Sequence, residues 1–292
     1  MSYLIFSDYK KSIQSVNLNQ VIGSDLTILM SWQLAAQEEC ASYLKQKYDV
    51  AQEFTDTAPW DPTKTYYAKD RVYLDADAYD SSAVYLVDAI TLQDGNVYQC
   101  VTGITSPEPF DSNSWLLLGP QYTLFYVNVP QTEFVFEKFY NKGDQVYWKN
   151  NTYTAQTFSA IYDKIQYPYT YNVPPINYFP DYLVNGQPNT QWGAGTSFSV
   201  PPGTTISDSR WIKGDNRSQQ LLEKCIDIVI YRAHVRVSPN NVPDVRHNNY
   251  LNAIQWLKDC SKGDIVPNLP RLQPKKGSRI RMGGEPKQQN SY

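Results

Sequence analysis

The sequence predicts an α+β protein in which a discontinuous helical bundle is interrupted by an antiparallel β insertion of two small repeated modules and ends in an extended tail. Apolar residues recur at helical spacing near both ends of the 292-residue chain, whereas short runs rich in Tyr, Val, Thr and Trp fill the middle. The predicted divisions are 1–54 with 214–266 for the helical domain, 55–120 and 121–213 for the β modules, and 267–292 for the tail.

The first predicted helix lies between Ser24 and Tyr48, and Ser24 or Asp25 can cap its first turn. Its apolar residues recur every three or four positions, which places them on one face. They are Leu29, Trp32, Ala36, Cys40, Tyr43 and Leu44.

Two further amphipathic helices are predicted near the other end of the chain. One follows Ser218, with its apolar face formed by Leu222, Cys225, Ile226, Val229, Ile230 and Ala233. The other begins near Pro243, whose missing N–H needs no partner in a first turn, and ends at Gly263, a favourable C-cap. Three such helices predict a bundle, because each must cover the apolar face of another.

The region between Thr55 and Lys213 repeats a pattern of strand and tryptophan. Segment 67–73 resembles segment 140–147, 96–100 resembles 151–155, and 111–115 resembles 208–211. Such self-similarity indicates repeated supersecondary units, so two copies of one β module are predicted. The Tyr- and Pro-rich stretch from Tyr167 to Gly203 is interpreted as a long loop of the second copy that packs on a neighbour.

The overall charge and hydropathy of the chain do not favour binding to nucleic acid or insertion into a membrane. The formal net charge is −3, and no apolar run reaches the roughly 18 residues expected of a membrane-spanning helix. No secretory leader is recognised, so synthesis in a cytoplasm is expected. Of the four cysteines, Cys40, Cys225 and Cys260 fall on apolar helix faces. Buried free thiols are therefore favoured over two disulfides.

The segment from Pro267 onward loses all periodicity and is basic. Its candidate docking residues are Arg271, Lys275, Lys276, Arg279 and Arg281. A tail of this composition does not fold alone. It is either a solubilising end, the commoner case, or a strand that docks on a partner subunit.

No enzyme is predicted, and neither catalytic residues nor a metal site nor a cofactor is expected. His234 and His247 are the only histidines, and neither lies in a motif with a nucleophile or metal partner. Asp70 and Asp144 occupy equivalent places in the repeats, which favours a structural hydrogen-bonding role over paired glycosidase carboxylates. A hydrolase with two accessory modules is the weakest alternative, because no region remains for its catalytic domain.

The helical segments resemble the head-tail adaptor (head-completion) family of tailed phages. The resemblance lies in Trp32–Val50, Leu221–Arg232 and Val245–Gly263, followed by Ile265–Pro270. It covers the two ends of the chain, and the large insertion departs from the family pattern. Neck ring proteins of crAss-like short-tailed phages are one setting that suits such an insertion.

Each β module is similar to the small aromatic modules of chitin- and cellulose-binding proteins. Sugar binding in such modules requires exposed coplanar rings, for which Trp60, Trp115, Trp148 and Trp211 are the candidates. In so small a module the same rings more often form the core.

The adaptor resemblance implies a structural virion protein that forms a ring in the neck between portal and tail, with DNA passing through its lumen. Its implied partners are further copies of itself, twelve by family resemblance, the portal protein and other neck or tail proteins, with non-specific contact to packaged DNA and none to a membrane. The alternative is a carbohydrate-binding virion protein that recognises host surface glycans.

Overall fold

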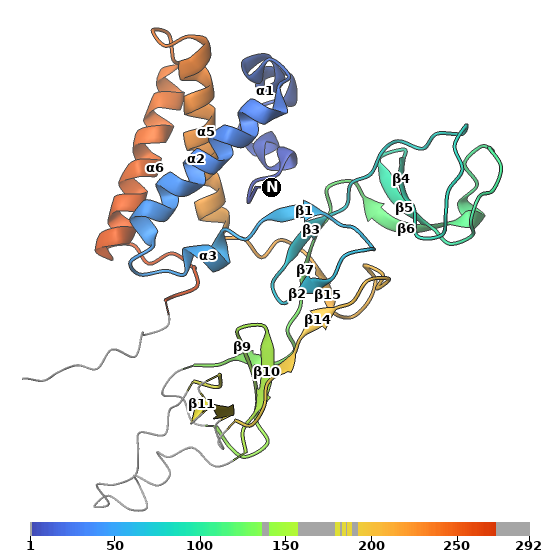
Figure 1. The fold of residues 1–292 in the computed structure, drawn as a ribbon. Coiled ribbons are helices and arrows are strands. Elements are labelled where there is room, and N and C mark those ends of the chain that lie inside the picture. Colours follow the sequence, from blue (N-terminus) through green and yellow to red (C-terminus); the bar gives the residue numbers. More distant parts are fainter. Residues whose placement is uncertain are drawn as a thin grey trace, which may run out of the picture.

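The computed structural model describes residues 2–135, 140–156, 179–181, 183–184, 186–188 and 192–272. It confirms the mixed α+β fold, in which helices from both ends of the chain pack together and mainly antiparallel sheets lie between them in sequence (Figure 1). We call the packed helices the helical frame. Its elements are η1 (Phe6–Lys11), α1 (Ser15–Ile22), α2 (Leu26–Leu44), α3 (Val50–Glu53), α5 (Gln219–Val237) and α6 (Asp244–Lys262).

The three predicted helices are α2, α5 and α6, and each packs on the other two. The Asp25 side chain caps α2 by accepting from the Thr27 N–H at 2.9 Å. Gly263 ends α6 in the left-handed region with φ 99°. The four cysteines are free and buried, as favoured from the sequence. The Sγ atoms of Cys40 and Cys225 lie 3.4 Å apart between α2 and α5.

The short helices η1, α1 and α3 were not predicted from the sequence. They bury few side chains, among them Tyr9 of η1 and Leu18 and Ile22 of α1. An eight-residue helix presents too few apolar positions for a helical period to stand out.

The insertion contains three β-units rather than two. The central unit lies next to the helical frame and joins sheet β1-β3-β7-β15 to the pair β2-β14. Its strands are β1 (Thr57–Pro59), β2 (Tyr66–Tyr67), β3 (Arg71–Tyr73), β7 (Leu124–Val127), β14 (Ser199–Val200) and β15 (Trp211–Lys213). Trp60, Val72, Phe125 and Trp211 lie in its core.

The side unit, residues 75–121, projects away from the helical frame in Figure 1. It is an antiparallel sheet in the order β4-β5-β6, with a core around Cys100, Ile104 and Trp115. Its elements are β4 (Ile90–Gln93), β5 (Asn96–Cys100), η2 (Ser112–Ser114) and β6 (Trp115–Pro120).

The lower unit comprises the described residues between 128 and 198 and hangs below the central unit in Figure 1. Its main sheet has the order β13-β10-β9-β8, and β11 pairs with β12. The bounds are β8 (Thr132–Glu133), β9 (Gln145–Trp148), β10 (Asn151–Thr154), β11 (Leu183–Val184), β12 (Gln187–Pro188) and β13 (Thr196–Ser197). Most of the predicted Tyr- and Pro-rich loop lies outside the described residues.

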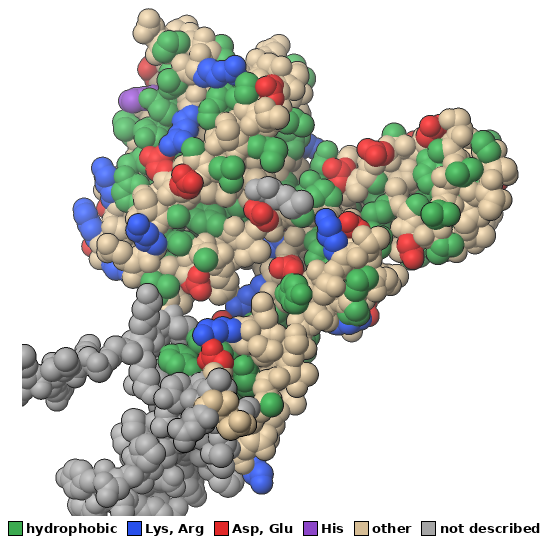
Figure 2. Space-filling model, viewed as in Figure 1, with side chains coloured by type: hydrophobic (Ala, Val, Ile, Leu, Met, Phe, Trp, Pro, Cys, Tyr) green, Lys and Arg blue, Asp and Glu red, His purple; other side chains and the backbone are tan. Residues whose placement is uncertain are grey.

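Charge is unevenly spread over these units. The 66 residues from Val72 to Glu137 contain neither Lys nor Arg. Figure 2 shows acidic side chains scattered over the side unit, while basic side chains gather on the helical frame and near the lower unit. The small net charge of the whole chain therefore conceals an acidic unit.

A buried network of charges joins the helical frame to the central unit. Arg71 of β3 donates to the backbone oxygen of Glu53 at 2.6 Å, and its guanidinium lies 3.7 Å from the Glu53 carboxylate. That carboxylate also accepts from the Tyr3 hydroxyl at 2.8 Å and from the Ser218 N–H at 2.9 Å. Strand β3, the N-terminal segment, α3 and the start of α5 thus meet at one glutamate.

Arg217 anchors the same junction from the other side. Its side chain has no exposed surface, and it donates to Asp8 at 2.7 Å and to Asp215 at 2.8 Å. It also donates to the Tyr3 backbone oxygen at 2.8 Å. Burial alone would lower the pKa of Arg217, but the two carboxylates outweigh burial and raise it. The residue therefore stays charged, and its partners depend on it.

Replacing Arg217 with Met should lower the free energy of unfolding by about 3–5 kcal/mol, because two carboxylates are left beside an apolar side chain. Urea denaturation followed by circular dichroism measures this. Arg232→Met is the matched control, since the Arg232–Glu39 pair is partly exposed and should cost about 1 kcal/mol or less. Equal losses in the two variants would contradict the role of this junction.

Candidate functional site

The three β-units repeat one local arrangement built on a tyrosine hydroxyl. In each unit an aromatic ring begins the motif, and a tyrosine follows six residues later. The backbone N–H of the residue after the first ring donates to that hydroxyl: Asp61 to Tyr66 at 2.7 Å, Asp80 to Tyr85 at 2.8 Å and Val135 to Tyr140 at 2.8 Å. The hydroxyl therefore closes the same loop in all three units.

A turn with positive φ follows each tyrosine by three residues. The residues are Lys69 (φ 71°), Asp88 (φ 71°) and Gly143 (φ 94°). Each of these turns exchanges two backbone hydrogen bonds with one distant residue, which is Val127, Cys100 or Ala155 respectively. Only the lower unit has glycine at this position. Lys69 and Asp88 adopt the left-handed conformation with a side chain present, which costs conformational energy that glycine does not pay.

A tryptophan packs edge-on against the tyrosine of every unit. Ring centroids lie 5.1 Å apart for Tyr66–Trp211, 5.2 Å for Tyr85–Trp115 and 5.1 Å for Tyr140–Trp192. Their interplanar angles are 72°, 76° and 70°. Aromatic pairs prefer this T-shaped geometry, which adds to the area that each ring buries.

This arrangement corrects the pairing of tryptophans with repeats. The sequence assigned Trp115 to the first copy and Trp211 to the second, whereas Trp115 closes the side unit and Trp211 closes the central unit. Trp192, which sequence reasoning missed, closes the lower unit. The first copy predicted from sequence joined parts of two units, because the side unit reads Asp88-Ala89 where the lower unit reads Gly143-Asp144.

The four candidate stacking tryptophans are all buried. Trp60, Trp115, Trp148 and Trp211 expose 2%, 5%, 8% and 6% of their surfaces. Their faces lie against neighbouring side chains, which leaves little room for a pyranose ring. Asp70 and Asp144 each accept from a turn N–H at 2.7 Å, as expected for the structural role.

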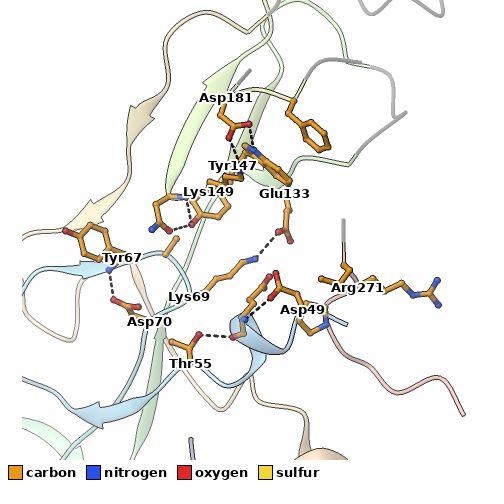
Figure 3. Close-up of a pocket in the computed structure, with 17 residues that line it drawn as sticks. Asp49, Thr55, Tyr67, Lys69, Asp70, Glu133, Tyr147, Lys149, Asp181 and Arg271 are labelled. Atoms are coloured by element: carbon orange, nitrogen blue, oxygen red, sulfur yellow. Dashed lines mark hydrogen bonds and ion pairs between the residues drawn. The ribbon is translucent and has the colours of Figure 1, made fainter. Parts of the chain in front are cut away.

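The described residues enclose a hollow of about 1020 Å³ where the helical frame, central unit and lower unit meet (Figure 3). Tyr67 and Lys69 enter it from the central unit, Glu133 and Lys149 from the lower unit, and Asp49 from the frame. Its lining brings polar side chains from several elements together in one concave surface, so it is the candidate site by geometry.

Two ion pairs line the hollow, and one of them joins two units. Lys69 reaches Glu133 at 3.1 Å across the junction of the central and lower units. Lys149 lies 2.6 Å from Asp181, which also accepts from the Trp148 indole N–H at 2.7 Å. Burial opposes ionisation of Asp181, but these two donors prevail and lower its pKa. Partly exposed pairs contribute little stability each, and of these two only Lys69–Glu133 connects the central unit to the lower unit.

The chain leaves the helical frame at the rim of this hollow. The Asp49 N–H donates to the Pro270 oxygen at 2.7 Å, and the Leu272 N–H donates to the Lys47 oxygen at 3.1 Å. Arg271 lines the hollow and pairs with Tyr48 in an antiparallel bridge. The other predicted docking residues, Lys275, Lys276, Arg279 and Arg281, lie outside the described residues.

The ionisable side chains that line the hollow are Lys, Arg, Asp, Glu and Tyr, and neither histidine is among the lining residues. Within the described ranges no three His, Cys, Asp or Glu side chains form a metal-binding cluster. His247 packs on Tyr231 with ring centroids 5.8 Å apart. It is not one of the residues that line the hollow. The arrangement binds units of the chain to one another through aromatic packing and ion pairs.

No protein-family model matches this chain, and no curated protein matches it. None of the helices in the described ranges is long and apolar enough to cross a membrane.

Tyr66→Phe should lower the free energy of unfolding by about 1 kcal/mol, because the Asp61 N–H loses its acceptor while the ring stays packed. Thermal unfolding measured by calorimetry tests this. The control is Tyr67→Phe, since the neighbouring ring is 45% exposed and its hydroxyl has no partner among the described residues. A loss at Tyr67 as large as that at Tyr66 would contradict the hydroxyl clamp.

Proposed function

We propose that this protein is a structural assembly component, a head-tail adaptor that forms a ring in the neck of a tailed-phage virion between portal and tail. The observation that carries the proposal is an uncharged, partly apolar surface on helix α2. Residues 26–37 contain no Asp, Glu, Lys or Arg. Leu26, Met30 and Leu34 recur every four residues there and expose 55%, 43% and 48% of their surfaces.

A helix face of this kind favours self-association. Surface helices usually carry charged residues on the side that faces water, and contiguous exposed apolar side chains mark interaction surfaces. In a cyclic assembly each copy presents one surface to the next, so a single contact is repeated around the ring and gains avidity. The twelve-copy ring rests on the family resemblance.

The remaining parts of the molecule suit the same role. The buried junction at Glu53 and Arg217 holds the central unit against the frame, and the other two β-units extend from it toward neighbouring portal, neck or tail proteins. The basic end of the chain supplies a segment that can order on a neighbour. Cations near a lumen would contact passing DNA through its phosphates without reading sequence.

The glycan-binding alternative draws on the threefold aromatic arrangement. Its weakness is the burial of the four candidate tryptophans. Tyr67, at 45% exposure, is the aromatic ring beside the hollow that remains open to a sugar. One exposed ring gives a smaller stacking surface than the coplanar sets that such modules use.

Cryo-electron microscopy of the native particle tests the assignment. We expect the chain in symmetry-averaged density as a closed ring beneath the portal, with α2 at the contact between copies. Finding the chain only in peripheral fibres would overturn the adaptor proposal and place the glycan-binding alternative first. Absence from the particle would overturn both virion roles.

The α2 surface has its own test. Met30→Glu with Leu34→Glu should abolish ring assembly on purified portal, because each contact between copies would bury two carboxylates. Electron microscopy of the reconstituted complexes counts the rings. Ser42→Glu, which adds a carboxylate to an exposed position on the same helix, is the control and should assemble normally. Assembly by the double variant would show that α2 is not the contact.

A further inference from the structure

All the charged side chains of the side unit are acidic. Between residues 75 and 121 it has no Lys or Arg and seven carboxylates, a formal charge of −7. They are Asp75, Asp77, Asp80, Asp88, Asp94, Glu108 and Asp111. None of them has an ion-pair partner within the described ranges. Such a field repels acidic surfaces and attracts basic ones.

Apolar side chains are exposed on the same unit. Leu86 exposes 82% of its surface, Leu117 56% and Val87 56%. The Asp88 N–H bonds the Cys100 oxygen on the β4 side of β5, and β6 pairs with β5 on the other side, so the segments that carry these residues flank β5. Figure 2 shows green side chains among the red ones on this unit. A surface both acidic and apolar fits a partner that is basic and apolar.

Strand β6 adds a free sheet edge. Within the described residues β6 pairs with β5 alone, and its exposed side chains include Leu116 and Leu117. An unpaired edge presents backbone N–H and C=O groups to solvent and is a template for one more strand. Peptides that bind in this way take affinity from main-chain hydrogen bonds and specificity from alternate side chains.

The chain itself contains a segment of the complementary chemistry. Residues 273–292 carry five Lys or Arg against Glu285, a formal charge of +4. Within them, Arg279-Ile280-Arg281-Met282 alternates basic and apolar residues. In an extended strand such alternation places apolar side chains on one face and guanidinium groups on the other.

Geometry favours a contact between copies. The last described residues lie beside the lower unit at the base of the helical frame, whereas the side unit projects from the opposite side (Figure 1). Two different surfaces on opposite sides of a molecule are what a head-to-tail contact in a ring requires. Twenty residues extend at most roughly 70 Å, more than three times the roughly 20 Å length of a six-residue strand such as β6.

We propose that the C-terminal segment 273–292 of one copy docks on the side unit of the next, adding a strand at the β6 edge, with its net positive charge attracted by the carboxylates of the unit. This inference rests on the proposed ring and names the surface that holds the tail. The carboxylates lose their mutual repulsion when the tail binds, and Leu116 and Leu117 become covered.

The test is fluorescence anisotropy with a labelled peptide of residues 270–292 titrated with the full-length protein. We expect saturable binding that weakens steeply with added salt. Asp77→Lys, Asp94→Lys and Glu108→Lys together should weaken it by about tenfold or more. These three were chosen because their carboxylates accept no backbone hydrogen bond. Circular dichroism and thermal unfolding check that this variant folds.

The control carries the same charge change on the helical frame, with Glu38, Glu223 and Asp264 each replaced by Lys at exposed positions. It should bind the peptide as the wild type does. A peptide in which Lys275, Lys276, Arg279 and Arg281 become Glu should fail to bind the wild type, because both surfaces are then acidic. Equal binding by both protein variants, or no binding at low salt, overturns the proposal.

These results are separable from the adaptor proposal. A neck ring in the particle, together with a peptide that ignores the side unit, would overturn the docking proposal and leave the adaptor intact. Peptide binding that is lost in the side-unit variant and kept in the helical-frame control, without a ring in the particle, would support the docking contact and overturn the adaptor.

Discussion

The buried ionic junction around Glu53 and Arg217 is the constraint on which the rest of the molecule depends. It brings together the N-terminal segment, the turn before α5 and strand β3, which are far apart in sequence. A buried charge without its partner costs several kcal/mol, so the chain is held to the one arrangement in which every charge is paired. The helical frame and the central unit therefore behave as one body, and the other two units are positioned from it.

The side and lower units are insertions in the sequence of the central unit. The side unit lies between β3 and β7, and the lower unit lies between β7 and β14. The chain leaves the central unit after β7 and returns to it at β14 and β15, more than 70 residues later. Each unit is too small for a large aliphatic core and is instead closed by an aromatic ring, a tyrosine hydroxyl and a tryptophan. Rings bury much area per residue, which lets so few residues hold a unit together. Because these tryptophans are buried in the cores of the units, their ring faces are not exposed to a ligand.

The molecule separates its surfaces by chemistry, and this separation suits an assembly protein. Helix α2 offers an uncharged apolar face, the side unit an acidic face with an open sheet edge, and the chain end a basic segment. An apolar face gives affinity, whereas charged surfaces select the partner and its orientation. The Lys69–Glu133 pair in the hollow adds a contact between the central and lower units.

The sequence by itself determined the helices α2, α5 and α6 and the free thiols. Helical periodicity and capping residues can be read locally: Asp25 caps the start of α2, and Gly263 ends α6. It also revealed that the middle repeats itself. Only the tertiary structure decided that there are three units and which tryptophan closes each. The reason is physical: a closing ring is chosen by packing across the sheet, and Trp211 reaches Tyr66 over more than a hundred intervening residues, a distance in sequence that no local pattern encodes.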